Sequence, residues 1–520
     1  MFRHNDGVLL ADLVKASAAV GATRSRKAKT AALAAALTEA GPDEVLTATS
    51  YLSGVLRQRR TGLGWRGLTD LPTPADTATL TVAEVHAAFE EISGLSGAGS
   101  QARRTELVER LFARATADEQ VYLRGLVTGE LRQGALDGLM LDAVALAAGV
   151  PAAAVRRASM FAGSTLPVAA AALTGGVPAL DEFGLRPGRP VRPMLASSAT
   201  EVSEAMAKAG PDGVAVAVDS KLDGIRIQVH KYDGEVHVFT RSLEEITDRV
   251  PEVVEAVSVL PARTLVLDGE AIALTPAGRA RPFQETGART ASRVDVATLR
   301  EAVPLTSYFF DLLHVDGEDL VDSPGRERFD RLSAVLPSEL VMPRTITADL
   351  DEAKRLFAQV VEAGHEGVVV KSLDAAYDAG RRGVGWVKVK PRHTLDLVVL
   401  AVEWGSGRRR GWLSNIHLGA RDPATGGFVM LGKTFKGMTD EMLAWQTERF
   451  LTLEESRSPY VVTLRPEQVV EVAFDGIQTS TRYPAGMALR FARVLRYRDD
   501  KGAHEADTVD EVRRLGRSSG

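Results

Sequence analysis

The spacing of apolar residues differs along the chain and divides it into parts with helical and with strand-like patterns. From residue 8 to about 180, alanine and leucine recur at helical spacing in KTAALAAALTEA, TVAEVHAAFEEISGL, RTELVERLFARA and LDAVALAAGV. Short stretches such as AGPDE and TDLPTPADTA separate them. This pattern predicts an all-α N-terminal domain over residues 1–185. The proline-rich stretch at residues 180–198, LDEFGLRPGRPVRPMLASS, predicts a linker.

Beyond the linker, β-branched residues alternate with polar ones. EVHVFTRS, TLVLDGEAIAL and HEGVVVKSL are typical of strands, whereas SPGRERFDRLSAVL and DLDEAKRLFAQVVEAG are typical of helices. The mixture predicts an α+β domain over residues 186–392. Residues 393–508 show short strands, turns and one helix around TDEMLAWQTERFL, which favours a small C-terminal β-barrel of the OB-fold type. The tail at 509–520 is expected to be frayed.

Composition narrows the classes of function. A hydrophobic content of 45% and a charged content of 25% are ordinary for soluble globular domains, which argues against a fibrous or disordered chain. The net charge of −5 gives no sign of nucleic acid, although acidic helices can cancel a basic face elsewhere. The absence of cysteine excludes disulfides, cysteine-ligated zinc and thiol catalysis. Since no apolar run could span a bilayer, we expect a cytoplasmic protein without a membrane partner.

One lysine stands at an unusual place in the strand pattern. The stretch VAVAVDSKLDGIRIQVHKYDGEVHVFTRS, residues 214–242, predicts three strands joined by turns, and Lys221 stands where the first strand meets Asp223 and Gly224. A lysine at a strand end is most often a solvated edge residue, and Asp-Gly is also an ordinary hairpin turn. Alone, the stretch therefore leaves both a structural and a functional role open.

The sequence SKLDGIR resembles the KxDGxR nucleophile motif of the covalent nucleotidyltransferases, the superfamily of DNA ligases, RNA ligases and mRNA capping enzymes. Further matches follow in the family's order: FTRSLEEIT, LDGEAIAL, YFFDLLHVDGEDL, EGVVVKSL, WVKVK and GMALRFARVLRYRDDK. Each alone has another explanation, because Phe310 could be a core aromatic and Lys388 and Lys390 could form the basic face of a half-buried strand. Their joint occurrence in order favours the resemblance to this superfamily over the separate explanations. The resemblance implies an ATP-grasp-like adenylation fold for the α+β domain.

The resemblance implies a role for each matched residue. Lys221 becomes the nucleophile that carries AMP, and Asp223 orients it and helps proton transfer. Implied contacts to ATP come from Asp219, Arg226, Arg241, Glu270, Phe310, Lys371, Lys388, Lys390 and Arg490. Glu270 and Glu366 are the implied ligands of Mg²⁺, for which Mn²⁺ can substitute. In the terminal motif, Arg490, Arg493, Asp500 and Lys501 are expected to reach the pyrophosphate that leaves in the first step.

Two of these positions carry further expectations. A lysine amine with an ordinary pKa of about 10.4 attacks only when neutral, so we expect cations such as Arg226 and Lys371 near Lys221, where they also bind phosphates. Asp219 stands where the family often has glutamate, which leaves the contact at that position open.

The rest of the chain distinguishes among members of the superfamily. YLRGLVTGELRQGALDGLMLDAVA resembles the DNA-binding domain of larger ATP-dependent DNA ligases, and VRPMLASS is also typical of them. The candidates for contacts with the DNA backbone are Arg124, Arg132, Arg408, Arg409 and Arg410. Periodicity alone explains the first two as solvated helix residues and the other three as a solvated loop. NAD⁺-dependent ligases carry a four-cysteine zinc module, so the absence of cysteine implies ATP as the adenylate donor.

The resemblance is greatest to actinobacterial and archaeal ATP-dependent DNA ligases, which implies nick sealing in three steps. Lys221 is adenylated with release of pyrophosphate, AMP passes to the 5′-phosphate at a nick, and the 3′-hydroxyl displaces AMP. We expect a monomer of the bacterial cytosol and nucleoid whose three domains encircle nicked duplex DNA, with a hinge near residues 390–396 and a role in repair, recombination or replication. An RNA ligase, a capping-type guanylyltransferase and a non-catalytic DNA-binding scaffold are the alternatives.

Overall fold

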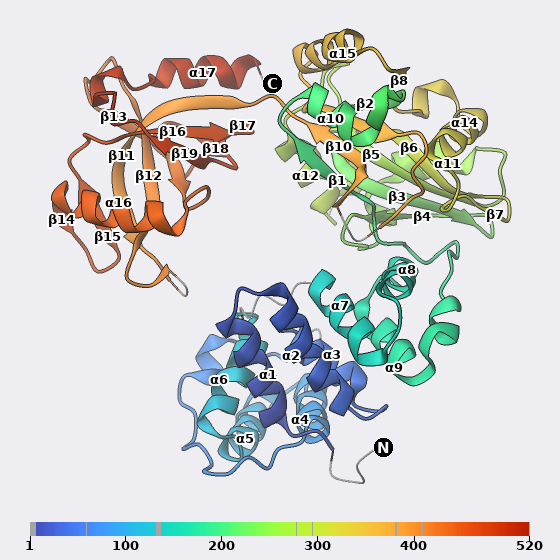
Figure 1. Ribbon diagram of the computed structural model, residues 1–520, viewed down its shortest axis with the longest axis vertical. Coiled ribbons are helices and arrows are strands. Elements are labelled where there is room, and N and C mark those ends of the chain that lie inside the picture. Colours follow the sequence, from blue (N-terminus) through green and yellow to red (C-terminus); the bar gives the residue numbers. More distant parts are fainter. Residues whose placement is uncertain are drawn as a thin grey trace.

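The computed structural model describes residues 7–58, 60–131, 137–276, 278–293, 295–379, 382–406 and 409–518. Three parts lie around a central opening: a helical part, an α+β part and a β-rich part (Figure 1). This arrangement confirms the predicted order of fold classes along the chain. In the described part of the chain, no helix is long and apolar enough to cross a membrane.

The N-terminal part is helical, as its apolar spacing predicts. The helices are α1 (Leu10–Ala22), α2 (Arg26–Glu39), α3 (Val45–Leu52), α4 (Val82–Gly94), α5 (Ser100–Ala113), α6 (Ala117–Thr128), α7 (Asp137–Ala148), α8 (Ala152–Ala162) and α9 (Thr165–Asp181), with a short 3₁₀ turn at Trp65–Leu68. Capping boxes explain two of the starts, because Thr81 and Glu84 close the first turn of α4, and Thr116 and Glu119 that of α6. The apolar faces of these helices share one core.

The α+β part contains two five-stranded sheets that face each other. The first has the order β1-β10-β9-β2-β8, with β1 (Leu195–Ala199), β2 (Val216–Lys221), β8 (Arg344–Thr347), β9 (Gly367–Ser372) and β10 (Arg382–Val389). The second has the order β4-β3-β5-β6-β7, with β3 (Ile225–Tyr232), β4 (Glu235–Thr240), β5 (Leu265–Ala273), β6 (Leu305–Val315) and β7 (Glu318–Asp319). The helices are α10 (Val202–Ala209), α11 (Pro251–Ser258), α12 (Phe283–Ala291), α13 (Val296–Ala302), α14 (Gly325–Val335) and α15 (Leu350–Glu362).

The strand pattern of residues 214–242 is confirmed, with one difference at the linker. Strands β2, β3 and β4 follow one another as predicted, but the turn after Lys221 carries the chain from one sheet to the other. The predicted linker over 180–198 is too long, because β1 already begins at Leu195 and pairs with β10.

The C-terminal part is built around one long strand, β11 (His393–Trp404), which pairs with β12 (Leu413–Arg421), β15 (Val461–Leu464) and β16 (Val469–Phe474). The remaining elements are β13 (Phe428–Thr434), α16 (Asp440–Thr452), β14 (Glu454–Arg457), β17 (Gly476–Thr479), β18 (Met487–Arg490), β19 (Arg493–Tyr497) and α17 (Val509–Ser518). The domain is OB-fold-like, as the sequence predicted, although the pairing of the described strands does not close into a complete barrel.

The frayed tail predicted for residues 509–520 is also wrong over its described part. Residues 509–518 form α17, whose Val509 and Val512 are buried against the C-terminal core. Two valines on one face of a short helix supply the apolar contact that holds it in place. The other domain boundaries stay predictions, as does the hinge near 390–396, where β10 gives way to β11.

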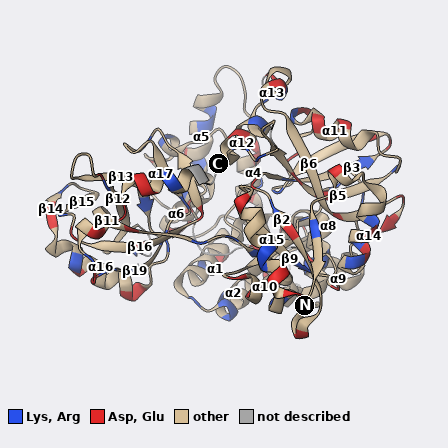
Figure 2. Cartoon of the chain, turned by 90° about the horizontal axis from the view of Figure 1, so that it is seen from above, with Lys and Arg blue, Asp and Glu red and all other residues tan. Residues whose placement is uncertain are grey.

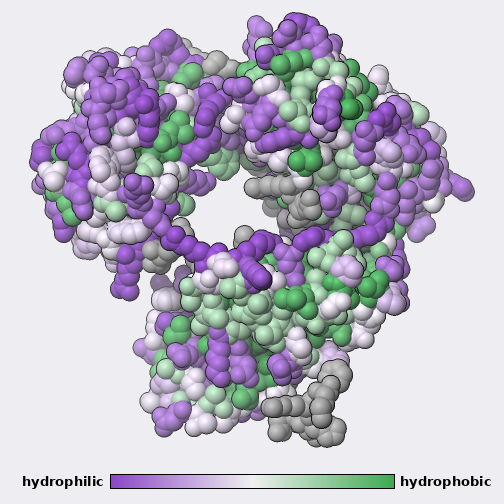
Figure 3. All heavy atoms as spheres, viewed as in Figure 1, coloured by the Kyte–Doolittle hydropathy of each residue, from purple (hydrophilic) through white to green (hydrophobic). Residues whose placement is uncertain are grey.

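Ion pairs join each part to its two neighbours, and together the parts form a ring. They include Arg24–Asp440 at 2.6 Å, Arg157–Asp322 at 2.6 Å and Arg490–Asp223 at 2.7 Å. A space-filling view shows the opening that the three parts surround (Figure 3). Seen from above, basic and acidic segments are interspersed over all three parts (Figure 2), which agrees with the small net charge of −5.

A buried polar network fastens the linker to strand β3. The backbone N–H of Gly188 donates to Nδ1 of His230 at 3.0 Å, and Gln228 exchanges two hydrogen bonds with the backbone of Val191. Nε2 of His230 donates to Oε1 of Gln228 at 2.9 Å. Because Nδ1 accepts, the ring is neutral in the folded chain, and burial lowers the pKa of His230 to about 3.

This histidine should make the fold sensitive to acid. An unfolded histidine binds a proton below a pH of about 6.5, so each pH unit below that value should cost about 1.4 kcal/mol of stability through His230. The effect should appear as the pH falls from 6.5 toward 3 and be absent above 6.5. We expect the free energy of unfolding, measured by urea titration at pH 7.5 and 5.5, to fall less in His230→Gln than in the wild type. The exposed His504→Gln serves as control, and an equal fall in all three proteins would contradict this assignment.

Candidate active site

A pocket of about 1010 Å³ lies where the two sheets of the α+β part meet. Residues that the sequence singled out form much of its wall: Asp219, Lys221, Arg226, Arg241, Glu270, Phe310, Glu366, Lys371, Lys388 and Lys390. They come from six strands, β2, β3, β5, β6, β9 and β10, and from loops beside them. The fold therefore gathers in one cavity residues that lie up to 171 positions apart in the chain, from 219 to 390.

Lys221 and Glu366 are brought together by strand register. Strands β2 and β9 are antiparallel with Lys221 opposite Gly367, and the backbone N–H of Glu366 donates to the carbonyl of Lys221 at 2.9 Å. Nζ of Lys221 donates to Oε2 of Glu366. Gly367 has a φ of +130°, and a Cβ there would lie 2.2 Å from the carbonyl oxygen of Val389, so only glycine fits beside Glu366.

Two carboxylates of different character face Lys221. Burial disfavours the ionised form of Glu366, but Lys221 and Lys390 outweigh it and hold the pKa of Glu366 below its ordinary value. Burial raises the pKa of Glu270 to about 7; Lys221 and Arg226 oppose that rise, and the nearby negative charge of Glu366 adds to it. The pair supplies hard oxygen atoms at one place in the pocket. Such a pair fits Mg²⁺ that takes its other ligands from phosphates and water, although the described residues contain no group of three or more acidic or histidine side chains that could hold a metal ion by itself.

The cationic residues of the pocket have different surroundings. Arg241, Lys388 and Lys390 line the pocket, and Lys390 donates to Glu366, the partner of Lys221, and lies 3.3 Å from Asp475. Arg226 lines the pocket but its guanidinium is held by both oxygens of Asp268 at 3.0 and 2.6 Å. Arg226 is thus fixed as part of the wall, whereas Arg241 is exposed.

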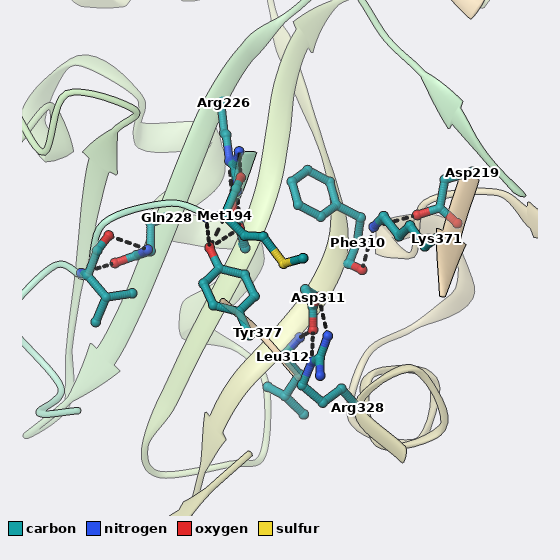
Figure 4. Close-up of polar contacts among 12 residues, drawn as sticks. Met194, Asp219, Arg226, Gln228, Phe310, Asp311, Leu312, Arg328, Lys371 and Tyr377 are labelled. Atoms are coloured by element: carbon teal, nitrogen blue, oxygen red, sulfur yellow. Dashed lines mark hydrogen bonds and ion pairs between the residues drawn. The ribbon is translucent and has the colours of Figure 1, made fainter. Parts of the chain in front are cut away.

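Aromatic rings form another stretch of the wall, and Figure 4 shows one of them, Phe310, beside Lys371 and Asp219. The ring of Phe310 meets that of Trp386 edge to face at 5.7 Å between centroids. Nζ of Lys371 lies 4.5 Å from the Phe310 ring and 2.7 Å from Oδ2 of Asp219, and the side chain is 2% exposed. This position differs from the phosphate contact that the sequence predicted for Lys371. A flat apolar ring beside a buried carboxylate is suited to a nucleotide base.

The C-terminal part also reaches this pocket. Asp475 and Phe491 line it, and Nη1 of Arg490 donates to Oδ2 of Asp223 at 2.7 Å. Arg493 lies 3.5 Å from Asp475. Asp500 and Lys501 do not line the pocket, because they pair within the C-terminal part, with Arg498 at 2.7 Å and with Asp396 at 2.6 Å. This arrangement therefore brings Arg490 to the nucleophile motif but leaves the end of the terminal motif outside.

The arginines predicted to bind DNA fall on two separate parts. The guanidinium of Arg124 lies 5.5 Å from the ring centroid of Trp65, a side chain that is 55% exposed. Arg409 donates to the carbonyl of Phe435 at 2.6 Å, and Arg410 is exposed. Arg132 and Arg408 lie outside the described residues.

Family comparisons agree with this geometry. Residues 193–390 match the ATP dependent DNA ligase domain, residues 409–501 the ATP dependent DNA ligase C terminal region, and residues 69–145 the DNA ligase N terminus. A curated relative from Nocardioides sp., named "Probable DNA ligase", is 65% identical over 98% of this chain and 99% of its own length. A relative of the same name from Beutenbergia cavernae is 64% identical over the same shares. The chain belongs to the ATP-dependent DNA ligase family.

A solved structure shares the fold of this ligase over nearly its whole length. The protein titled "Pmar-Lig_PreS3" aligns with a TM-score of 0.62 over 94% of this chain and 99% of its own length, at 17% identity. At that identity the likeness shows the shared fold alone. Together with the curated relatives it confirms the predicted family and fold class.

Several side chains of the ligase site, Phe491 among them, were missed by the sequence analysis. Trp386 stands inside the WVKVK motif and could have been found there, and Arg249 and Asp475 line the pocket without any motif to mark them. Arg344 follows Pro343 at the start of a short strand, and no sequence pattern links it to Asp219, which it contacts at 2.6 Å.

Proposed function

We propose that this chain seals nicks in duplex DNA with ATP, through AMP carried on Lys221. The observation that carries the proposal is the pocket whose wall holds Lys221, Glu270 and Glu366 together with the aromatic ring of Phe310. A nucleotide with its base on Phe310 would place its phosphates among Arg241, Lys388 and Lys390. Family membership supports ATP as the nucleotide and DNA as the substrate.

The first step forms a P–N bond. The neutral amine of Lys221 attacks the α-phosphorus of ATP, the bond to the bridging oxygen breaks, and pyrophosphate leaves with the electron pair of that bond. Glu366 holds Nζ of Lys221 toward the pocket and is the group beside it that can accept its proton. Cationic side chains on the pocket wall stabilise the charge that develops on the phosphate oxygens.

The two later steps move AMP to DNA and then release it. A 5′-phosphate oxygen at the nick attacks the phosphorus of the lysine adduct, which frees Lys221 and forms a pyrophosphate linkage. The 3′-hydroxyl then attacks the 5′-phosphate, a phosphodiester forms, and AMP leaves. Both transfers would take place beside Lys221, in the pocket that it lines.

Glu270 and Glu366 are the residues that would hold Mg²⁺. When bound, the ion neutralises negative charge on the phosphate oxygens. Burial raises the pKa of Glu270 to about 7, so a cation bound beside it would favour its ionised form.

The ring of three parts supports a duplex in the central opening, with the chain acting as a monomer. Arg124, Arg409 and Arg410 are our candidates for phosphate contacts on the N- and C-terminal parts. For Asp500 and Lys501 to reach the pyrophosphate in the first step, the C-terminal part has to rotate about residues 390–396.

Two assays test this function. Wild-type protein incubated with labelled ATP and Mg²⁺ should acquire a covalent acid-labile label, and it should convert a nicked DNA duplex to a continuous strand. Labelling by GTP in place of ATP would favour a guanylyltransferase, and sealing of nicked RNA but not DNA would favour an RNA ligase. A protein that binds nicked DNA but takes no label with either nucleotide would be a scaffold.

A further inference from the structure

Beside Phe310 lies a buried group of charges in which one member, Arg344, belongs to no matched motif. Arg344 begins strand β8, directly opposite Asp219 on β2. Its Nε and Nη2 donate to the two oxygens of Asp219 at 2.6 and 2.7 Å, and Nη2 also donates to the carbonyl of Phe310 at 2.8 Å. One guanidinium thus ties together a carboxylate and the main chain of the aromatic residue.

Lys371 completes the same group from strand β9. Its Nζ contacts Oδ2 of Asp219 at 2.7 Å and the carbonyl of Phe310 at 3.3 Å, so both cations hold the same two partners. Asp219 and Lys371 line the pocket, whereas Arg344 lies behind the wall and is 11% exposed. A contact between Arg344 and a nucleotide is therefore not required for Arg344 to influence binding.

The neighbouring residue, Asp311, is anchored separately. Arg328 donates to both of its oxygens at 2.8 and 3.2 Å, and both side chains are fully buried (Figure 4). This second pair fixes the strand that carries Phe310 but does not touch Asp219. Among the ion pairs of the described residues, those with Arg344 and Lys371 hold the Asp219 carboxylate.

We propose that Arg344 is a positioning residue that sets the preference of this site for adenine over guanine. A carboxylate held beside the base can accept a hydrogen bond from the 6-amino group of adenine. Guanine presents an oxygen at that position, and two acceptors facing each other cost binding energy. Arg344 keeps the carboxylate ionised and aimed, and it holds Phe310 at a fixed distance from it. This inference rests on the proposed adenylation of Lys221.

The test replaces Arg344 and measures adenylation of Lys221 under single-turnover conditions. In Arg344→Met we expect the concentration of ATP at half-maximal rate to rise by about tenfold, while the rate at saturating ATP changes by less than about threefold. The efficiency of labelling is the maximal rate divided by the nucleotide concentration at half-maximal rate. The ratio of this efficiency for ATP to that for GTP should fall by about tenfold. Arg344→Lys keeps the charge but cannot reach both Asp219 oxygens and Phe310, so it should give an intermediate ratio.

Arg331→Met is the matched control, because Arg331 pairs with the exposed Glu318 outside the pocket. It should leave unchanged both the ATP concentration at half-maximal rate and the ATP to GTP ratio. If folded Arg344→Met keeps the wild-type ATP to GTP ratio, the inference is overturned, whatever happens to the overall rate. Should Arg344→Met not fold, a wild-type ratio in Arg344→Lys overturns it equally. A wild-type protein that takes no label from either nucleotide refutes the proposed function instead.

Discussion

Replacement of Lys221 by alanine should abolish covalent labelling of the protein by ATP, by more than about 10³-fold. Lys221 contacts Glu366 from β2, and in the proposed reaction its amine forms the P–N bond. The loss should be complete for sealing of an ordinary nick with ATP. Gel separation of labelled protein after acid denaturation, followed by a nick-sealing assay, measures both effects.

The same variant should still act on a nick that already carries AMP on its 5′-phosphate. The final step needs the 3′-hydroxyl and the charged pocket, not the amine, so its rate should stay within about tenfold of the wild type. Lys221→Arg restores the positive charge without a nucleophilic amine and should behave like Lys221→Ala. Lys208→Ala, in an ion pair with Glu204 on α10, is the control and should be labelled normally. Normal labelling of Lys221→Arg would place the adduct on another residue.

Replacement of Glu366 by glutamine should slow adenylation of Lys221 by about 10² to 10³-fold at saturating ATP. The carboxylate contacts both Lys221 and Lys390, so the neutral amide would leave two ammonium groups close together without their shared counter-ion. Because the pKa of Glu366 lies below its ordinary value, the carboxylate is ionised at neutral pH and the substitution removes a full charge. Single-turnover labelling at pH 7.5 gives the rate.

Two controls separate a local from a general effect of this substitution. Glu362→Gln changes an exposed residue near the end of α15, four positions before Glu366, and should leave the rate unchanged. The melting temperature of Glu366→Gln should remain close to that of the wild type, since the side chain keeps its shape. A rate within about threefold of the wild type would remove Glu366 from the reaction centre.

Much of the candidate site could be predicted because motif residues stand at the ends of strands. Lys221, Glu366 and Lys390 each lie at or beside a strand end, and the register of β2, β9 and β10 then brings them together. The alternation of valines predicted the strands but not their partners. It could not show that β2 and β3 belong to different sheets, which is the feature that creates a pocket after Lys221.

The parts that could not be predicted depend on long-range packing. Lys371 was expected at the phosphates because it is a lysine in a nucleotide-binding motif, yet on β9 it faces Asp219 and two aromatic rings. Nothing local to the sequence distinguishes a lysine that will be buried against a carboxylate from one that stays exposed. Asp475 likewise comes from another domain, so its place beside Lys390 depends on how the domains meet.

The contact that closes the ring has a topological consequence. A circular DNA has no end to thread, so a closed protein ring around it forms a mechanical link that sliding cannot undo. The link breaks where Arg24 meets Asp440, and these side chains are 75% and 41% exposed. An exposed pair of this kind contributes about 0–1 kcal/mol and weakens with salt. Escape from a circle is then governed by the opening of this gate, whereas a short linear duplex can also leave through its ends.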